Sequence, residues 1–579
     1  MSARARSGDT NAAGSSKTSR VTAYFLRITA LADRWAKLSA LLLGLVSATG
    51  FAPLNLWPLT ILAFAGLMAL VARSTAGWRA FGIGWAFGVG HFALGLNWIA
   101  TAFTYQAAMP AWLGWIAVLL LSLYLAIYPA LAAWGAWAVQ RYAAPPKTEA
   151  AGSQGSGASA NPVVAGATLS FILAFAGFWT LTEWLRSWIF TGFAWNPLGA
   201  FLIPVSLASP AKAIGTYGLS GLALLWIGWG LRLAPHWLTT IGRNPRERAS
   251  LAVVILNAVA LFGAPLLLAL VMDIGETELA RSRATAPITL VQPNIGQEDK
   301  WEGGKADANF SKLARLTVAR NDTPRLILWP EAAIPDYLEA GYPSVYYDRA
   351  PADARRRLTG LMNRGDLMLL GALKLELDRA GDVVGARNAV MALHADGSLG
   401  PRYDKAHLVP YGEYLPMRSL LSAIGLSRLA PGDIDFWPGP GARTLDLGRF
   451  GKAGLQICYE IIFSGQVVDR AHRPDFIFNP SNDAWFGAWG PPQHLAQARL
   501  RAIEEGLPVL RATPTGISAA IDASGRILEA VPMHEAGRID IAVPRAHTPT
   551  AFARYGNKLP VGLALLLVAA GIAFRRRGR

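Results

Sequence analysis

The only cysteine of the chain, Cys458, lies in the stretch GLQICYEIIFSG, between a short apolar run and a polar turn. A lone cysteine is usually a small buried hydrophobic residue, so it indicates catalysis only if activating partners occur elsewhere. Two other segments share its pattern of an apolar run that ends in a reactive side chain. RLILWPEAAIP carries Glu331 after Pro330, and RYDKAHLVPYGEYLP carries Lys405 with Glu413 eight residues later. Together they offer a thiol, a carboxylate and a cation.

Each of these residues, considered alone, is more typical of a structural or solvent-exposed position than of a catalytic one. A Glu after a strand is most often solvated or starts a helix, and a Lys in a polar loop is ordinarily a solvated cation. His407 is a further candidate base for the thiol, although a His beside LVPYG is more often structural. Open α/β sheets place their sites at the carboxyl ends of strands, so we expect the three segments to converge there.

Residues 284–545 contain the elements that position these side chains. Short β-rich runs alternate with helical stretches, which predicts an α/β domain. The β-rich runs are ITLVQPN, RLILWPE, LMLLGAL, NAVMALH, AGLQICYE and DFIFNPS, and HLAQARLRAIEEG is typical of a helix. No repeat period indicates a solenoid.

The rest of the chain is strongly apolar. Hydrophobic residues make up 53% of the 579 residues and charged residues only 16%, against about 25% charged in soluble domains, so we predict a membrane protein. About eight spans are predicted, at 38–54, 57–73, 80–103, 112–140, 163–183, 213–233, 249–272 and 558–574. The predicted regions are a polar basic tail (1–37), a membrane domain of seven helices (38–273), the α/β domain (284–545) and a C-terminal transmembrane helix (558–575).

The net charge of +16 follows the predicted spans. The tail, alternate loops and the end of the chain are basic, whereas the loops PLNLW and TYQAAMP carry no charge. The positive-inside rule then places both termini in the cytoplasm and the α/β domain outside it. This distribution argues against nucleic acid as a partner. The tail is too long and polar for a cleaved signal peptide, and the Gly/Ser/Ala-rich stretch 148–161 predicts a flexible cytoplasmic loop.

Read together, LWPEAA, YDKAHLVPYGE and GLQICYE resemble the three motifs of the nitrilase superfamily in order and spacing. The resemblance implies an αββα sandwich over 284–545, with a triad of Glu331, Lys405 and Cys458. Spans on both sides of such a domain are similar to the plan of the apolipoprotein N-acyltransferase family. So are VQPNIGQEDKW, SNDAWFG, GPPQHLAQARLRAIEEGLPVLRATPTGIS, FAPLNLWPL, GLNWI and TEWLRSWIFTGFAWNPLG. Only the tail and the 148–161 loop depart from it.

This resemblance implies a reaction. An acyl chain moves from a membrane phospholipid, through a cysteine thioester, to the N-terminal α-amine of a diacylglyceryl-cysteine apolipoprotein. It occurs on the periplasmic side of a bacterial inner membrane, in a monomer without metal or cofactor. Glu331 would be the base, which requires surroundings that raise its pKa, and Lys405 would face the oxyanion. Glu413, assigned to orienting Lys405, and Tyr459 and Glu460 match further site residues of the family.

Other polar and aromatic residues have two interpretations. Trp301, Trp485 and Phe486 match aromatics that the family uses near the acyl pocket or on mobile loops, and ordinary core or interface packing is the alternative. Glu183 and Arg186 lie three residues apart on one face of a predicted span. They would pair with each other or meet a lipid head group, and we favour an ion pair because ionisable groups at membrane depth usually find partners.

Two rival functions remain. A membrane-tethered amidase or nitrilase would use water as the acceptor, but a tether needs one span rather than eight. A transporter or scaffold with an inactive outer domain would carry ionisable residues through its spans. Here Glu183, Arg186 and His91 are nearly all there are.

Overall fold

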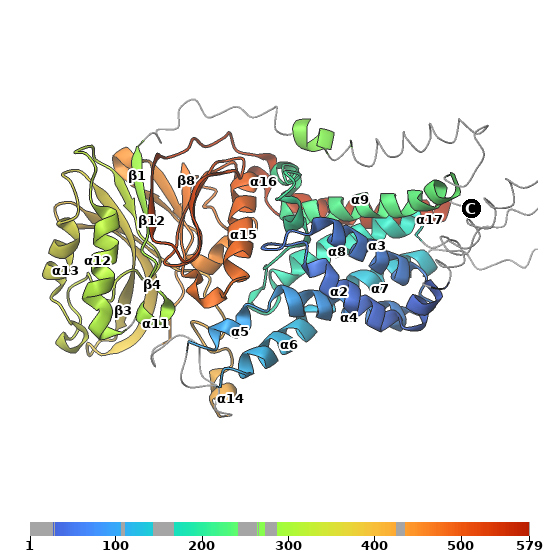
Figure 1. The fold of residues 1–579 in the computed structure, drawn as a ribbon, viewed down its shortest axis with the longest axis horizontal. Helices are drawn as coiled ribbons and strands as arrows, with labels where there is room; N and C mark the ends of the chain where they lie inside the picture. The colour runs from blue at the N-terminus through green and yellow to red at the C-terminus, as the bar shows by residue number, and fades with distance from the viewer. Residues whose placement is uncertain are drawn as a thin grey trace, which may run out of the picture.

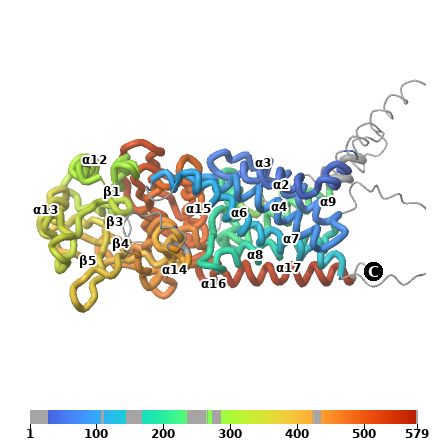
Figure 2. Tube along the Cα trace, turned by 90° about the horizontal axis from the view of Figure 1, so that it is seen from below, coloured from blue at the N-terminus to red at the C-terminus, as the bar shows by residue number. Residues whose placement is uncertain are grey.

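The computed structural model describes residues 27, 29–105, 110–142, 167–240, 263, 266–271, 286–300, 302–423 and 435–577. It consists of helices that run along the long axis of the molecule and a β sandwich at one end (Figures 1 and 2). The C-terminal helix ends at the far end of the helical part from the sandwich (Figure 2). Trp301, the 148–161 loop and most of the predicted span 249–272 lie outside the described residues.

The helical part is built from apolar segments of unequal length. Its main helices are α2 (Ala36–Ala48), α3 (Trp57–Ala72), α4 (Gly77–Gly95), α5 (Ile99–Ala102), α6 (Leu113–Leu125), α7 (Ile127–Tyr142), α8 (Leu169–Arg186), α9 (Ala211–Thr240) and α17 (Lys558–Arg577). Three stretches are long and apolar enough to cross a membrane, namely Leu113–Tyr142, Ala211–Leu233 and Lys558–Arg576. Helices α2 and α3, with 13 and 16 residues, fall short of the roughly 20 that a span needs. The count of eight spans therefore stays a prediction.

Helices α2 and α4 pack closely because glycines line their contact. A Cβ at Gly44 would lie 2.0 Å from the backbone oxygen of Phe87, and one at Gly90 would lie 2.2 Å from that of Leu41. Small residues permit such an approach in membrane proteins, where van der Waals packing rather than apolar burial holds helices together.

The sandwich contains two mixed sheets of six strands each. The strand orders are β12-β1-β2-β3-β4-β5 and β11-β10-β9-β8-β7-β6. In each sheet three parallel strands, β1–β3 or β7–β9, are flanked by antiparallel strands. The bounds are β1 (Pro287–Gln292), β2 (Leu326–Leu328), β3 (Leu367–Leu377), β4 (Val383–His394), β5 (Leu399–Asp404), β6 (Thr444–Asp446), β7 (Lys452–Leu455), β8 (Phe476–Pro480), β9 (Val509–Ala512), β10 (Ser518–Ile521), β11 (Ile527–Val531) and β12 (Gly537–Ala542).

Both faces of the parallel strands are covered, so these strands are apolar throughout. In β2, Leu326 and Leu328 face the core between the sheets, whereas Ile327 faces the helices α12 (Ala306–Thr317) and α13 (Pro351–Thr359). Helix α15 (Gly490–Glu505) lies between the second sheet and the helical part (Figure 1). The layers form an αββα sandwich, the fold that the resemblance to the nitrilase superfamily implies.

A buried ion pair within α15 is hydrogen-bonded to helix α9. Arg501 and Glu504 lie 2.7 Å apart and are almost fully buried. The Glu504 carboxylate accepts hydrogen bonds from the backbone N–H of Thr216 and from the hydroxyl of Ser464. Arg501 donates to the backbone oxygen of Ile462 at 2.9 Å. The two parts of the molecule therefore share a fully buried polar contact beside the segment that carries the cysteine.

Candidate active site

Three strand ends bring the predicted catalytic residues together. Glu331 follows β2, Lys405 directly follows β5, and Cys458 begins the short 3₁₀ helix η6 (Cys458–Ile462) after β7. Strands β2 and β5 belong to one sheet and β7 to the other, so the site takes residues from both sheets. All three residues are buried, with 6%, 2% and 5% of their surface exposed.

Lys405 and Asn388 tie two glutamates together. Nζ of Lys405 lies 3.0 Å from Oε1 of Glu413 and 3.5 Å from Oε1 of Glu331. Nδ2 of Asn388, on β4, donates to the same two oxygens at 3.0 and 2.7 Å. Oε2 of Glu413 accepts from the backbone N–H of Val409 at 2.9 Å, so Glu413 is held at both oxygens. No flanking motif marks Asn388 in the sequence, because it lies within a strand.

Glu331 uses only one carboxylate oxygen in this network. Its Oε2 accepts no hydrogen bond of normal geometry from the described part of the chain. The thiol of Cys458 lies beside the same carboxylate. The Glu331 carboxylate therefore lies where it can receive the proton of the thiol.

The charges around Glu331 correct one expectation. Burial favours a raised pKa for this carboxyl, but Lys405, Lys300 and hydrogen bonds to the carboxylate outweigh burial and lower the pKa. The surroundings therefore do not raise the pKa of Glu331, as we expected them to do for an efficient base, because the two lysines outweigh burial. Burial disfavours the charged form of Lys405, but Glu413 and Glu331 outweigh it and raise the pKa of Lys405, so this residue stays a cation.

Lys300 is a second lysine of the site that the motifs did not single out. Its Nζ donates to the backbone oxygen of Glu331 at 2.9 Å. Burial lowers the pKa of Lys300 to about 8, against the opposing effects of Glu331 and Cys458. Lys300 lies in VQPNIGQEDKW, a segment that carries the family resemblance, but a lysine there is ordinarily solvated, so nothing in the segment marks this side chain as part of the site.

Cys458 sits on a strained turn between a strand and a helix. Its φ of 53° lies in the left-handed region that residues with a Cβ rarely adopt. Burial raises the pKa of the thiol well above its ordinary value; Glu331 and Asp483 add to this, and Lys405 opposes it. The resting sulfur is therefore a protonated thiol, and a thiolate requires transfer of its proton to a base.

Glu460 connects the cysteine turn to the loop after β5. One of its oxygens accepts from the backbone N–H groups of Ala406 and His407 at 2.7 and 3.0 Å. The other accepts from Ile457 N–H at 2.7 Å, and the Tyr403 hydroxyl donates to both. Burial raises the pKa of Glu460 to about 7 despite these donors. Its contacts are all to the protein framework, so Glu460 fixes the turn that carries the thiol.

Tyr459 and His407 pack toward the helical part. The Tyr459 hydroxyl donates to the backbone oxygen of Gly192, which follows α8, at 3.2 Å. The His407 ring stacks on Phe463 with centroids 3.8 Å apart, and burial lowers the pKa of His407 to about 4. A neutral, stacked imidazole fits the structural alternative for His407 better than the role of a base.

The predicted aromatic residues lie at the junction with the helical part. The Trp485 ring lies 5.8 Å from that of Tyr105. Phe486 is buried, with its ring 4.7 Å from Trp98 and 5.5 Å from Trp195. These contacts fit the interface alternative for Phe486. The third predicted aromatic lies outside the described residues.

A second buried charge cluster contacts the cysteine from its backbone side. Arg511 on β9 donates to Asp483, on the 3₁₀ helix η7 (Asp483–Phe486), at 2.7 Å. Nδ1 of His494 lies 3.0 Å from Asp483, and its Nε2 lies 3.1 Å from the carbonyl oxygen of Cys458. The segments SNDAWFG and GPPQHL carry the family resemblance, but nothing within them marks these side chains as neighbours of the thiol.

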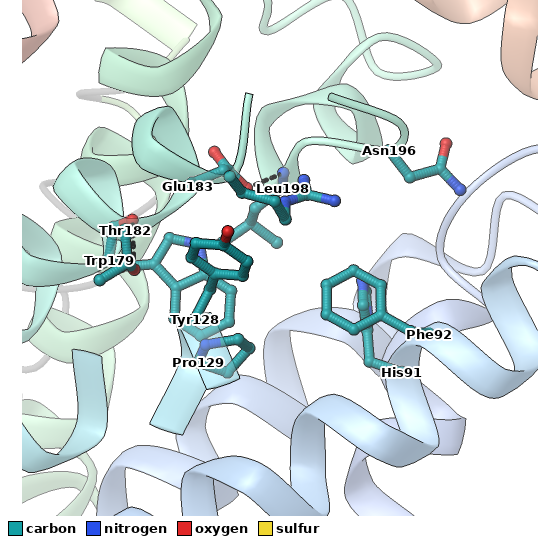
Figure 3. A pocket seen from close by; sticks show the side chains of 10 residues that line it. His91, Phe92, Tyr128, Pro129, Trp179, Thr182, Glu183, Asn196 and Leu198 are labelled. Atoms are coloured by element: carbon teal, nitrogen blue, oxygen red, sulfur yellow. Dashed lines mark hydrogen bonds between the residues drawn. The ribbon is translucent and has the colours of Figure 1, made fainter. Parts of the chain in front are cut away.

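Glu183 and Arg186 line a small cavity of about 20 Å³ in the helical part (Figure 3), room for about one water molecule. Figure 3 shows the hydrogen bond from the backbone N–H of Leu198 to Glu183, which is 2.8 Å long. Arg186 donates to the backbone oxygen of Trp195 at 2.9 Å. Within the described residues no direct ion pair joins the two, so the ion pair favoured from the sequence is wrong. Instead, both side chains bind the backbone of the segment from Trp195 to Leu198, which follows Gly192.

Two family models together cover most of the chain. The model described as "Apolipoprotein N-acyltransferase N-terminal domain" matches residues 43–229. The model described as "Carbon-nitrogen hydrolase" matches residues 287–549, which include the sandwich and all three predicted triad residues. The sandwich is thus a nitrilase-like carbon-nitrogen hydrolase fold.

Curated relatives match over nearly the full length. Apolipoprotein N-acyltransferase of Rhodopseudomonas palustris is 33% identical over 556 residues, covering 93% of this chain and 95% of the relative. The enzyme of the same name from Bradyrhizobium diazoefficiens is also 33% identical, with coverage of 93% and 95%. Among solved structures, Saccharomyces cerevisiae Nit3, of the nitrilase superfamily, is 22% identical and covers 44% of this chain and 90% of that one. The TM-score of this alignment is 0.31. Because these relatives match over nearly the full length of both chains, the chain belongs to the apolipoprotein N-acyltransferase family.

Proposed function

We propose that this protein transfers an acyl chain from a membrane phospholipid, through a thioester on Cys458, to the N-terminal α-amine of a diacylglyceryl-cysteine apolipoprotein. The observation that carries the proposal is the buried cluster of Glu331, Lys405, Glu413 and Cys458. Membership of the family and the names of its relatives support the acceptor. The apolar helices fit a membrane protein, whose bilayer supplies the donor.

The first step forms the thioester. Oε2 of Glu331 takes the thiol proton while the Cys458 sulfur attacks the ester carbonyl of the phospholipid. Lys405 supplies positive charge as the carbonyl oxygen becomes an oxyanion. When the intermediate collapses, the C–O bond breaks, and the lysophospholipid leaves with the proton from Glu331. The pKa of Glu331 is low and that of Cys458 is high, so the proton moves as the S–C bond forms rather than beforehand.

The second step transfers the acyl chain. The free α-amine of the lipoprotein attacks the thioester carbonyl, and Glu331 takes a proton from the nitrogen. The C–S bond breaks, and the proton returns to the leaving sulfur, which restores the thiol. The product is an amide, and the enzyme returns to its starting state.

One acyl-enzyme serves two lipid substrates, so we expect ping-pong kinetics. The thioester must survive until the acceptor arrives, which requires exclusion of water. Cys458 is only 5% exposed, which supports acyl transfer over the hydrolase alternative.

The test uses the full-length protein in detergent with labelled phosphatidylethanolamine as the only lipid substrate. Excess lipid is removed, the label on Cys458 is measured, and a diacylglyceryl-cysteine peptide is then added. We expect a labelled enzyme that passes its label to the peptide, and parallel double-reciprocal plots. Failure to isolate a labelled enzyme, or intersecting plots, would support a sequential mechanism. Release of label as free fatty acid without peptide would support a hydrolase.

The proposal also includes a topology. Eight spans place both termini in the cytoplasm and the catalytic sandwich in the periplasm, and the alternation of basic loops supports this. A reporter fused in the 148–161 loop or after Arg579 should report cytoplasm. A reporter at Ala380, on an exposed turn of the sandwich, should report periplasm. A cytoplasmic signal at Ala380 would separate the site from periplasmic lipoproteins.

The protein is proposed to be a monomer, which light scattering in detergent checks.

A further inference from the structure

The backbone carbonyl of Cys458 has its own hydrogen-bond partners. Nε2 of His494, on α15, lies 3.1 Å from this oxygen. Nδ2 of Asn479, on β8, lies 3.5 Å from it and donates to the neighbouring Gln456 oxygen at 2.6 Å. A carbonyl oxygen can only accept, so this contact is a hydrogen bond when His494 carries its proton on Nε2, and Nδ1 then accepts from Arg511 at 3.0 Å.

The conformation of Cys458 needs such support. Its φ of 53° is a strained value for a residue with a side chain, and strain of this kind persists only when the surroundings hold it. The orientation of the peptide group after Cys458 determines where its carbonyl points. A donor fixed against that carbonyl therefore stabilises the strained turn and, with it, the direction of the Cα–Cβ bond.

His494 is itself held rigidly. Arg511 donates to both carboxylate oxygens of Asp483, at 2.7 and 2.5 Å, and lies 3.0 Å from Nδ1 of His494. Arg511 also donates to the hydroxyl of Ser481 at 3.0 Å. His494 and Arg511 are 0% exposed, and Asp483 is 1% exposed. On its other side the imidazole packs against the ring of Trp195, with centroids 5.2 Å apart.

We propose that His494, oriented by Asp483 and Arg511, is a positioning residue that holds Cys458 in its reactive conformation by donating Nε2–H to the Cys458 carbonyl. The inference rests on the proposed function, because it takes Cys458 to be the nucleophile. His494 is not the base for the thiol in this arrangement, since its Nε2 is already bonded to the backbone. Asp483, His494 and Cys458 therefore form a support for the backbone rather than a proton relay.

The experiment compares two substitutions of His494 that differ in one property. In His494→Gln, Nε2 of the amide is as many bonds from Cα as Nε2 of the imidazole, so it can donate to the same carbonyl. In His494→Met, a side chain of similar length has no donor. The surface residue His472, 77% exposed on its side chain, provides the control His472→Met.

The measurement is the rate of acyl transfer to Cys458 from phosphatidylethanolamine in detergent micelles, with the full-length protein. We expect His494→Met to slow the rate at saturating lipid about tenfold, the size of one lost hydrogen bond. The lipid concentration for half-maximal rate should be unchanged. His494→Gln should recover most of the rate, and His472→Met should match wild type. A melting temperature in detergent accompanies each rate.

The inference is overturned if His494→Met forms the thioester as fast as wild type, or if His494→Gln is as slow as His494→Met at an unchanged melting temperature. If wild type itself forms no thioester, the proposed function fails instead. If His494→Met does not fold, ¹⁵N NMR of the wild-type histidines still decides the point. A proton on Nε2 of His494 supports the inference, and one on Nδ1 alone contradicts it.

Discussion

Two buried charge clusters lie on either side of Cys458, and they use their charges differently. One contains Glu331, Lys405 and Glu413 at the ends of strands of the first sheet, and it approaches the sulfur. The other contains Asp483 from η7, His494 from α15 and Arg511 from the second sheet, and it contacts the backbone oxygen. Both clusters are buried, and a buried charge without its full set of hydrogen-bond and ionic partners costs folding free energy.

The difference lies in what remains unbonded. In the first cluster Lys405 is shared by two carboxylates, and one oxygen of Glu331 has no ordinary partner among the described residues. In the second cluster both oxygens of Asp483 are bonded to Arg511. An unbonded oxygen can exchange a proton with the thiol, whereas a saturated carboxylate can only hold its neighbours in place. Buried charges can therefore serve chemistry or rigidity, according to which lone pairs are satisfied.

Replacing the residue between the clusters should have the largest effect. Cys458→Ser removes the acidic nucleophile, and a hydroxyl beside Glu331 is far harder to deprotonate. We expect loss of thioester and a fall in acyl transfer of about a thousandfold or more, measured with labelled phospholipid. The melting temperature should be nearly unchanged. Wild-type transfer by this variant would contradict the assignment of Cys458 as the nucleophile.

Neutralising the first cluster should reduce rate rather than stability. Glu331→Gln removes the base, and we expect kcat to fall by about 10²- to 10⁴-fold. Glu413→Gln keeps the shape but weakens the hold on Lys405, with an expected loss of about a hundredfold. Single-turnover acylation and thermal unfolding are measured on the same samples. If both variants unfold but their folded fraction reacts at the wild-type rate, the cluster stabilises the fold and does not act in catalysis.

Breaking the second cluster should reduce stability first. Arg511→Met leaves the Asp483 carboxylate buried without its cation, and we expect the free energy of unfolding to fall by about 3–5 kcal/mol. The check is the melting temperature in detergent. Arg526→Met, which removes a cation from an exposed pair with Asp522, is the matched control and should change little. Equal melting temperatures for the two variants would contradict the comparison.

Glu460 should behave as part of the framework. Both carboxylate oxygens of Glu460 accept from backbone N–H groups, one from Ile457 and the other from Ala406 and His407. In Glu460→Gln one of these oxygens becomes an NH₂ group, which cannot accept. A donor facing a buried donor costs about 1–3 kcal/mol. We expect a lower melting temperature and less expression of active protein. A fully stable variant would show that these bonds do not fix the turn.

The smallest effect is a shift in pH dependence. Glu331 acts as a carboxylate, so activity is lost as pH falls through its pKa. Burial raises that pKa, and Lys405 and Lys300 outweigh burial and lower it. Lys300→Met should therefore raise the pKa of Glu331 and move the acid limb of kcat/KM to higher pH. Lys305→Met, an exposed lysine paired with Asp299 and Glu302, should leave the limb in place. An unmoved limb in Lys300→Met would show that Lys300 does not act on Glu331.

The sequence alone singled out the segments of the first cluster because each reactive residue follows an apolar strand and has characteristic neighbours. Glu331, Lys405 and Cys458 stand in such segments, and the structure places them within one buried site. The local pattern predicted an α/β domain, since apolar strands and amphipathic helices can bury their faces in few ways. The αββα layering itself came from the resemblance of the three motifs to the nitrilase superfamily. The number of membrane spans was harder to predict from the sequence, because helices such as α2 and α3 are apolar but short.

Only the tertiary structure decided which side chains surround those three residues. Asn388, Lys300 and His494 come from separate elements and lie in stretches where an amide, a lysine or a histidine is ordinarily unremarkable. Glu183 and Arg186 share a helix face, yet each binds backbone atoms of the segment that follows their helix instead of its neighbour. The direction of the pKa shift at Glu331 depended on two lysines brought close by folding. The physical reason is that sequence pattern reports burial and local conformation, whereas electrostatics and hydrogen bonding depend on distances between segments far apart in the chain.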